Sequence, residues 1–330
     1  MDTETQTTAR PAGKPAPKAA GKSTYVQLLT EICREEGITL SSWSSDWAFR
    51  LTKGTRRAFI LGYQFGLNSS SSQQICTDKN IASEILRDSG VACVPHRLVM
   101  SPALLRYNGP EGGYRIIAEE LAKSGAIVLK DNVGTGGREV YLARTMAEAE
   151  YAADQIFRVS RSLAVCPYRE IREEIRVVML DGEIRLAFRK IRPSVTGDGK
   201  STLGELIGRE ICRQRFPGLT LPDADKMKKV PAAGEQILLS WKHNLGQGAE
   251  PRRILREELD PRVKALAVSA SGALSVRFAS VDIIRSEAGY EVLEVNSGVM
   301  MEHFASHSPE YRAAAKEIYR DAVRKMMEQP

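Results

Sequence analysis

Residues 280–302, SVDIIRSEAGYEVLEVNSGVMME, constrain this chain more than any other segment. Asp282 lies in one apolar run, and Glu294 and Asn296 alternate with apolar residues in the next. Because residues i and i+2 of a strand point to the same face, Glu294 and Asn296 project together, and a turn at residues 286–289 brings Asp282 alongside them. Two carboxylates and an amide oxygen suit a hard cation such as Mg²⁺. Taken alone, the pattern is more often a solvated edge hairpin, so the rest of the chain decides.

The composition is that of an ordinary globular protein: 42% of the 330 residues are hydrophobic and 27% are charged. This length allows two or three packed subdomains. No apolar run reaches the roughly 18 residues of a membrane span, and the N-terminus lacks the apolar core of a secretory signal. We therefore expect a cytoplasmic protein without a membrane partner. Residues 1–23, rich in Ala, Pro, Lys and Thr, are predicted to be a disordered basic arm.

Cysteine usage and charge weigh against three further classes. The cysteines are scattered, odd in number and without a C-x-x-C pair, which argues against a disulfide framework and a zinc site. The net charge of +6 is compatible with nucleic acid, but no basic motif is interleaved with aromatic residues, so that partner is disfavoured. Acidic or phosphate-bearing small substrates explain the charge equally well.

A small N-terminal α/β subdomain is predicted for residues 24–76. Residues 25–37 have helical apolar spacing that ends in glycine, and residues 58–62 are expected to form a strand. Ser69 to Ser72 are expected to form a polar loop outside the core. That loop is either a spacer or a hydroxyl-rich rim around a substrate.

Two lysines and a glycine loop indicate a phosphate site. Asp78 is expected to cap a helix whose first turn holds Lys79, a position that suits a bound anion. A buried strand then ends in Lys130, and the next strand follows a loop that contains Gly134, Thr135, Gly136 and Gly137. Glycines let backbone N–H groups approach phosphate oxygens, so this hairpin is interpreted as a lid over phosphates. A plain glycine turn is the alternative, and a P-loop is excluded because no G-K-[ST] or helix follows.

The following strands could bind a nucleoside. The edge of the strand at residues 164–167 can offer backbone donors and acceptors to a purine. An Asp-Gly turn at residues 181–182 predicts a strand pair on which Glu174 and Arg176 share a face. Glu174 could then accept hydrogen bonds from ribose hydroxyls, and Lys190 could reach a phosphate.

These pieces, in this order, resemble the ATP-grasp superfamily of carboxylate-amine ligases, above all the ATP-grasp modules of cyanophycin synthetase and bifunctional glutathione synthetases. The stretches that carry the resemblance are TDKNIASEILRDSGVACVP, VTGDGKSTLGELI, VPAAGEQILLSWKHNLGQGA and VDII…EVLEVNSG. The resemblance implies an α+β (α/β) ATP-grasp fold, in which two antiparallel-sheet lobes clasp ATP. Residues 77–163 would form a linker helix and the small lobe, and residues 164–330 the large lobe with the metal site.

The resemblance also implies a role for each site residue. The implied nucleotide ligands are Lys79, Lys130 and Lys190 at the phosphates, the lid residues Gly134, Thr135, Gly136 and Gly137, the adenine hinge Val165, Cys166 and Pro167, and Glu174 at the ribose. The implied metal ligands are Asp282, Glu294 and Asn296, for one or two Mg²⁺ ions with Mn²⁺ as the alternative. Arg176 and Asn244 are the implied catalytic contacts to a carboxylate or acyl phosphate.

The sequence departs from the family pattern on the acceptor side. The family ends its metal motif in N-x-x-P-G, whereas residues 296–300 read NSGVM. The family's N-L-S-T-G-G loop is NLGQG here, and the preceding arginine is replaced by Ser240. The substrates are therefore expected to differ from those of cyanophycin and glutathione synthesis. No Mur-ligase-like module follows Pro330, so a single ligation is expected.

The implied reaction is ATP-dependent formation of an amide between a small carboxylate, such as an amino acid, and an amine. It would proceed through an acyl phosphate and release ADP and phosphate. The partners are then two small molecules, and a homodimer is the default assembly. Two alternatives remain open, namely a ligase that adds amino acids to a protein terminus and a non-catalytic ATP-binding regulatory protein.

No catalytic histidine is predicted, because the four histidines fit no triad. The i, i+4 pair His303 and His307 is interpreted as a surface helix end rather than a metal pair. Phosphate, water and Glu302 remain alternatives for removing the proton of the amine.

Overall fold

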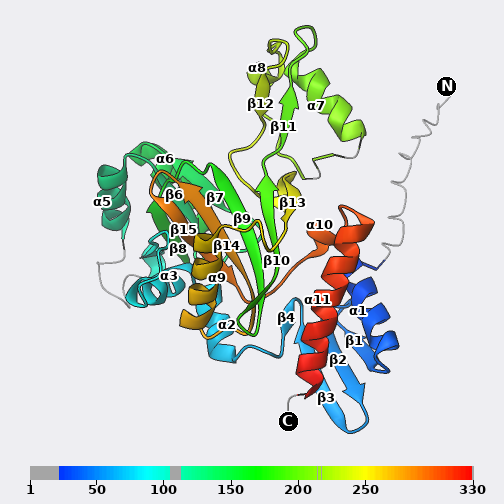
Figure 1. Ribbon diagram of the computed structural model, residues 1–330. Helices are drawn as coiled ribbons and strands as arrows, with labels where there is room; N and C mark the ends of the chain where they lie inside the picture. The colour runs from blue at the N-terminus through cyan, green and yellow to red at the C-terminus, as the bar shows by residue number, and fades with distance from the viewer. Residues whose placement is uncertain (1–21, 105–112, 214, 217, 329–330) are drawn as a thin grey trace, which may run out of the picture.

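The computed structural model describes residues 22–104, 113–213, 215–216 and 218–328. Within these ranges the chain forms an N-terminal unit, a small lobe, a large lobe and a projecting arm (Figure 1). The predicted basic arm of residues 1–23 lies almost entirely outside them. No helix in these ranges is long and apolar enough to cross a membrane.

The N-terminal unit combines an antiparallel sheet with helices from opposite ends of the chain. Its strands, in the order β1-β2-β3-β4, are Thr39–Trp43, Ala48–Lys53, Arg56–Leu61 and Gln64–Phe65. Its helices are α1 (Thr24–Glu35) and α11 (Pro309–Glu328). Both lie on one face of the sheet (Figure 1). The predicted helix and the predicted strand at residues 58–62 are confirmed.

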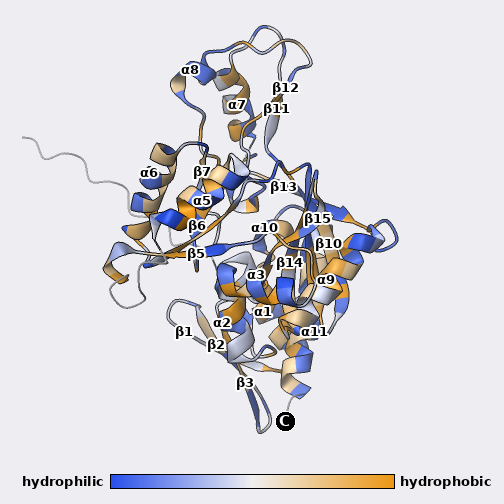
Figure 2. Cartoon of the chain, turned by 90° about the vertical axis from the view of Figure 1, so that its left-hand side faces the viewer, coloured by the Kyte–Doolittle hydropathy of each residue, from blue (hydrophilic) through white to orange (hydrophobic). Residues whose placement is uncertain are grey.

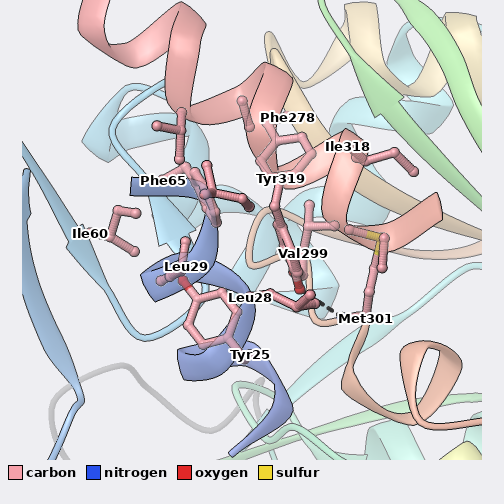
Figure 3. Packing of buried hydrophobic residues seen from close by; sticks show 14 of the residues in the cluster. Tyr25, Leu28, Leu29, Ile60, Phe65, Phe278, Val299, Met301, Ile318 and Tyr319 are labelled. Atoms are coloured by element: carbon pink, nitrogen blue, oxygen red, sulfur yellow. Dashed lines mark hydrogen bonds between the residues drawn. The ribbon is translucent and has the colours of Figure 1, made fainter. Parts of the chain in front are cut away.

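Tyr319 of α11 fixes the C-terminal helix to this unit (Figure 3). Its buried ring stacks on Phe65 at 5.6 Å between centroids and meets Tyr25 edge-on at 5.3 Å. The Tyr319 hydroxyl donates to the carbonyl oxygen of Val299 and accepts from the N–H of Met301, each at 2.9 Å. The segment that follows the predicted metal strand is therefore anchored on the N-terminal unit.

The run of four serines starts a helix and does not form the expected polar loop. Ser69 accepts a hydrogen bond from the N–H of Ser72 at 3.1 Å, and Ser72 is buried. The prediction was wrong because these hydroxyls cap and pack the first helical turn. Asp78 caps the next helix as predicted. The two helices are α2 (Ser70–Thr77) and α3 (Lys79–Asp88).

The small lobe is a four-stranded antiparallel sheet covered by two helices. Its strands, in the order β5-β8-β6-β7, are Arg97–Met100, Ser162–Pro167, Ile127–Asp131 and Val140–Ala143. Its helices are α5 (Tyr114–Ser124) and α6 (Met146–Phe157). The hairpin predicted around the glycine loop is β6 and β7. The boundary expected after residue 163 falls inside β8, because that strand pairs with β5 and β6 throughout the small-lobe sheet.

The large lobe is built on a five-stranded antiparallel sheet. Its strands, in the order β13-β10-β9-β14-β15, are Glu250–Ile254, Glu183–Ile191, Glu173–Leu180, Phe278–Ser286 and Gly289–Asn296. Helices α3 and α9 (Pro261–Ala273) pack on one face. The hairpin of β14 and β15 is confirmed, with Asp282 directly opposite Glu294 in the register. Asp282 also lies opposite Arg176 of β9 on its other side.

An arm leaves the large lobe between β10 and β13 (Figures 1 and 2). It contains β11 (Ser194–Thr196), α7 (Leu203–Cys212), α8 (Ala224–Met227) and β12 (Gln236–Leu238). A small apolar core of its own, which includes Val195, Leu206 and Phe216, holds the arm together. After the arm, the chain returns to β13 through a short 3-10 helix, η2 (Leu245–Gln247). A second short helix, α10 (Glu302–Ala305), lies between β15 and α11.

Candidate active site

A cavity of about 650 Å³ is lined by residues of the small lobe, the large lobe and the N-terminal unit. Every predicted site residue except Val165 lines it. The Val165 side chain packs into the small-lobe core instead. Its strand is an inner one at this point, with Val165 between Arg97 of β5 and Leu129 of β6. Of the open edge predicted at residues 164–167, only residues 166 and 167 lie past the last residue pair between β8 and β5.

An apolar pocket forms one part of this cavity, between the sheets of the two lobes. Val128 and Cys166 come from the small lobe, and Ile284 and Leu293 from the large lobe. Two apolar walls on facing sheets suit the flat ring of a purine. Sequence reasoning missed Ile284, although strand alternation places it on the face of Asp282. Leu293 was not predictable, because a bulge in the register lets consecutive residues of β15 line the cavity.

A chain of buried charges crosses the sheet of the large lobe. Lys190 Nζ lies 2.6 Å from Glu174 Oε1 and 2.9 Å from Asp282 Oδ2. Arg176 binds both oxygens of Asp282, at 2.7 and 2.6 Å. Burial raises the pKa of Glu174 although Lys190 opposes this. Burial also opposes ionisation of Asp282, but Arg176 and Lys190 hold its pKa well below the usual range.

Glu294 and Asn296 lie beside two lysines. Asn296 Nδ2 donates to Glu294 Oε1 at 3.0 Å. Burial and the charge of Asp282 oppose ionisation of Glu294, yet Lys79, Lys130 and this hydrogen bond hold its pKa below the usual range. Burial lowers the pKa of Lys79, whose Nζ donates to the carbonyl of the lid residue Gly134 at 2.6 Å. A phosphate in this place would offer both lysines a stronger acceptor.

The predicted metal ligands suit a Mg²⁺ ion that also binds phosphate oxygens and water, and do not form a complete site made of protein side chains. In the described part of the chain, no three His, Cys, Asp or Glu side chains form a group that could hold a metal. Asp282 is already neutralised by Arg176 and Lys190, so Glu294 and the amide oxygen of Asn296 are the predicted ligands that could still bind a cation. Mg²⁺ is commonly held by one or two carboxylates and completed by phosphate oxygens and water.

The glycine loop is held down by the loop at residues 242–247. Asn244 Nδ2 donates to the carbonyl of Gly136 at 2.8 Å. Lys242 and Gln247 donate to the carbonyl of Gly137 at 3.3 and 3.4 Å. The predicted lid and the loop that departs from the family pattern are thus directly connected.

Three of the histidines and Glu302 differ in their contacts and in whether they line the cavity. His243 is buried with Nδ1 2.8 Å from the carbonyl oxygen of Lys190, and burial lowers its pKa to about 4. His303 lines the cavity, whereas the ring of His307 stacks on that of Tyr311. Glu302 accepts hydrogen bonds from the N–H of Tyr25 and from a tyrosine hydroxyl. Both carboxylate oxygens of Glu302 thus bind residues of the N-terminal unit, and Glu302 is not among the residues that line the cavity.

Parts of this chain are similar in sequence to known proteins. Residues 234–318 match the RimK-like ATP-grasp domain. The chain is 27% identical over 282 residues to cyanophycin synthetase of Trichormus variabilis, covering 74% of this chain and 29% of that protein. It is 43% identical over 58 residues to tetrahydromethanopterin:alpha-L-glutamate ligase of Methanocaldococcus jannaschii, covering 18% of this chain and 19% of that protein. The chain thus spans less than a third of the length of these curated relatives.

Solved structures show the same fold at low identity. The bifunctional glutathione synthetase from Pasteurella multocida aligns with a TM-score of 0.56 and 17% identity over 90% of this chain and 44% of that one. D-alanine–D-alanine ligase from Bacillus anthracis aligns with a TM-score of 0.52 and 18% identity over 80% and 72%. Two sheets that enclose a nucleotide-sized cavity under a glycine loop define an ATP-grasp architecture. The chain therefore has the ATP-grasp fold, and residues 234–318 are similar to the RimK-like ATP-grasp domain, in agreement with the resemblance in its sequence motifs.

Proposed function

We propose that this chain is an ATP-dependent ligase that joins a carboxylate to an amine through an acyl phosphate. The observation that supports this proposal most strongly is that the groups needed for both steps line one cavity. An apolar pocket, two lysines, the pair Glu294 and Asn296, and a glycine lid all line it. These are the parts that a phosphoryl transfer followed by an acyl transfer needs.

The cavity suggests how ATP would bind. The base would lie between the apolar walls of the two lobes. Glu174 uses one carboxylate oxygen for Lys190 and would accept from a ribose hydroxyl with the other. Lys79 and Lys130 would bind phosphate oxygens of ATP through their ammonium groups. Mg²⁺, held by Glu294 and Asn296 with Asp282 nearby, would neutralise charge on the phosphates and act as a Lewis acid.

The reaction would proceed in two steps. A carboxylate oxygen of the first substrate attacks the γ-phosphorus, and the bond to the β,γ-bridging oxygen breaks, which leaves an acyl phosphate and ADP. The amine nitrogen of the second substrate then attacks the acyl carbon, the carbon–oxygen bond to phosphate breaks, and one proton leaves the nitrogen. Lysine charges would stabilise the developing negative charge in the first step. Arg176 would act by holding Asp282 in place, since its guanidinium is already engaged by both carboxylate oxygens.

The lid would protect the intermediate. An acyl phosphate reacts with water, so the cavity has to stay closed until the amine arrives. Asn244, Lys242 and Gln247 hold the glycine loop from the opposite side. In this scheme Asn244 serves as a latch of the lid as well as a neighbour of the acyl phosphate.

The test is product analysis with pairs of amino acids. Wild-type protein with Mg²⁺ and ATP is expected to release ADP and phosphate with at least one pair, and Glu294→Ala is expected to release neither. Glu287→Ala, at the exposed turn of the same hairpin, is the matched control and should behave as wild type. Formation of AMP and pyrophosphate would contradict the mechanism. Nucleotide binding without turnover for every pair would favour the non-catalytic alternative.

A further inference from the structure

Two large apolar side chains of the N-terminal unit, Trp47 in the turn between β1 and β2 and Leu61 at the end of β3, line the cavity although more than half of each is exposed. The exposed fractions are 55% for Trp47 and 58% for Leu61. Exposed apolar surface in a cavity wall is unfavourable unless a ligand covers it. This part of the wall belongs to the N-terminal unit, outside the two lobes that would hold ATP.

The backbone that presents Trp47 is strained. Ser44, Ser45 and Asp46 have φ angles of 53°, 55° and 62°, so three consecutive residues with side chains adopt the left-handed conformation. Such a conformation is uncommon outside glycine and unfavourable for L-residues. Strain of this kind persists where the surrounding structure requires it, and it is concentrated at binding sites. Here it places the indole of Trp47 at the cavity.

Further contacts fix Trp47 in that position. The N–H of Gly62 donates to the carbonyl of Trp47 at 2.7 Å, and the Tyr25 hydroxyl donates to the carbonyl of Gly62 at 2.9 Å. A Cβ atom at position 62 would lie 2.7 Å from the indole ring, and φ of Gly62 is 55°. Only glycine therefore lets the indole lie across this turn. The ring of Tyr63 meets the indole nearly perpendicularly at 6.3 Å between centroids.

This wall reaches the segment that follows the metal strand. Gln64 Nε2 donates to the hydroxyl of Ser297 at 3.1 Å. An ideal Cβ at position 298 would lie 3.6 Å from Cβ of Tyr63, so the two segments are in contact at Gly298. Ser297 directly follows Asn296, so the wall begins one residue beyond the proposed metal ligands. It is also where the sequence departs from the N-x-x-P-G pattern of the family.

We infer that Trp47 and Leu61, together with Tyr63 and Met300, form a subsite for an aromatic or branched aliphatic side chain on one of the two substrates. The inference rests on the proposed function and names a substrate class for it. The four side chains carry no charge, so none of them offers an ion-pair partner to an acidic or basic substituent, which would lose water against them. An indole face and a leucine side chain gain contact area with an apolar group instead.

Binding of two blocked amino acids tests the subsite and identifies its occupant. L-Phenylalaninamide offers only the amine, and N-acetyl-L-phenylalanine offers only the carboxylate. Calorimetry in the presence of Mg²⁺ and ADP is expected to show that one of them binds to the wild type at least tenfold more tightly than its glycine counterpart. Trp47→Ala and Leu61→Ala are each expected to remove most of this preference.

Matched controls come from the same sheet. Trp43 and Phe59 are 48% and 64% exposed but do not line the cavity. Trp43→Ala and Phe59→Ala should therefore leave binding unchanged. Gly62→Ala, which displaces the indole without removing it, should weaken binding as Trp47→Ala does, and the melting temperature of each variant shows whether it is folded.

The outcomes separate the subsite from the ligase activity. Failure of both phenylalanine compounds to bind the wild type more tightly than the glycine compounds overturns the inference, and so does equal weakening by Trp43→Ala. Selective binding that depends on Trp47, without phosphate release from ATP for any substrate pair, would support the subsite and count against the proposed ligase activity.

Discussion

Asn244 and Gly136 connect the acceptor-side loop to the glycine lid through a hydrogen bond of 2.8 Å from the side-chain amide to the backbone carbonyl. The other end of the Asn244 side chain accepts from the N–H of Gly246, also at 2.8 Å. A Cβ at position 137 would lie 2.2 Å from Asn244 Nδ2, so glycine is required for this approach. The lid and the acceptor loop are therefore expected to close together.

Asn244→Ala is predicted to uncouple ATP hydrolysis from ligation. Loss of one hydrogen bond of about 1 kcal/mol should open the lid roughly fivefold more often and expose the acyl phosphate to water. The measurement is the ratio of phosphate to ligation product, which should rise several-fold. Gln247→Ala, which removes a longer bond of 3.4 Å to Gly137, should give a smaller rise. An unchanged ratio in Asn244→Ala would rule out the latch.

Asp282→Asn and Glu294→Gln are predicted to differ in stability although both should abolish turnover. Asp282→Asn leaves Arg176 and Lys190 without their shared counter-ion in a buried site, which should destabilise the fold by about 3–5 kcal/mol. Glu294 has no ion pair among the described residues, so Glu294→Gln should change the free energy of unfolding by less than about 1 kcal/mol. Denaturant unfolding and phosphate release measure the two effects. Equal destabilisation by both substitutions would contradict the assignment of separate roles.

Stability should fall on acidification because of His243. Burial lowers its pKa to about 4 from an ordinary value of 6.5. The unfolded chain therefore takes up this proton before the folded chain does, and the contribution is full above pH 6.5 and is lost as the pH falls toward 4. Between pH 7 and pH 4.5 the expected loss is about 2 kcal/mol. Unfolding of wild type and His243→Asn at pH 7 and pH 4.5 measures it, and an equal loss in both proteins would exclude His243 as the cause.

ATP is predicted to stabilise the protein chiefly when Mg²⁺ is present. A ligand at one hundred times its dissociation constant stabilises a fold by about 2.7 kcal/mol, which should appear as a shift of the melting temperature. Addition of EDTA should remove most of the shift in the wild type. Glu294→Gln should show a small shift that EDTA does not change. A full shift without a divalent cation would argue against a metal at Glu294 and Asn296.

Much of the architecture could be read from local sequence. Strand alternation placed Glu294 and Asn296 on one face, and the hairpin brought Asp282 opposite Glu294. Glycine between two apolar runs predicted the lid hairpin, and Asp78 predicted the start of α3. These features depend on neighbours within a few residues, where side-chain periodicity and capping are the dominant forces. The run of serines misled because hydroxyls serve helix caps and loops equally well.

The tertiary structure decided which residues surround the hairpin of residues 280–302. Sequence alone predicted that three side chains with oxygen atoms share this hairpin, because a strand period of two is a local property. It could not show that Arg176 and Lys190 neutralise Asp282, whereas Glu294 has no such ion pair among the described residues, since those contacts join strands far apart in the chain. Nor could it show that Trp47, at the other end of the chain, reaches the same cavity. Such pairings are set by the packing of three units around one cavity, where long-range burial outweighs local preference.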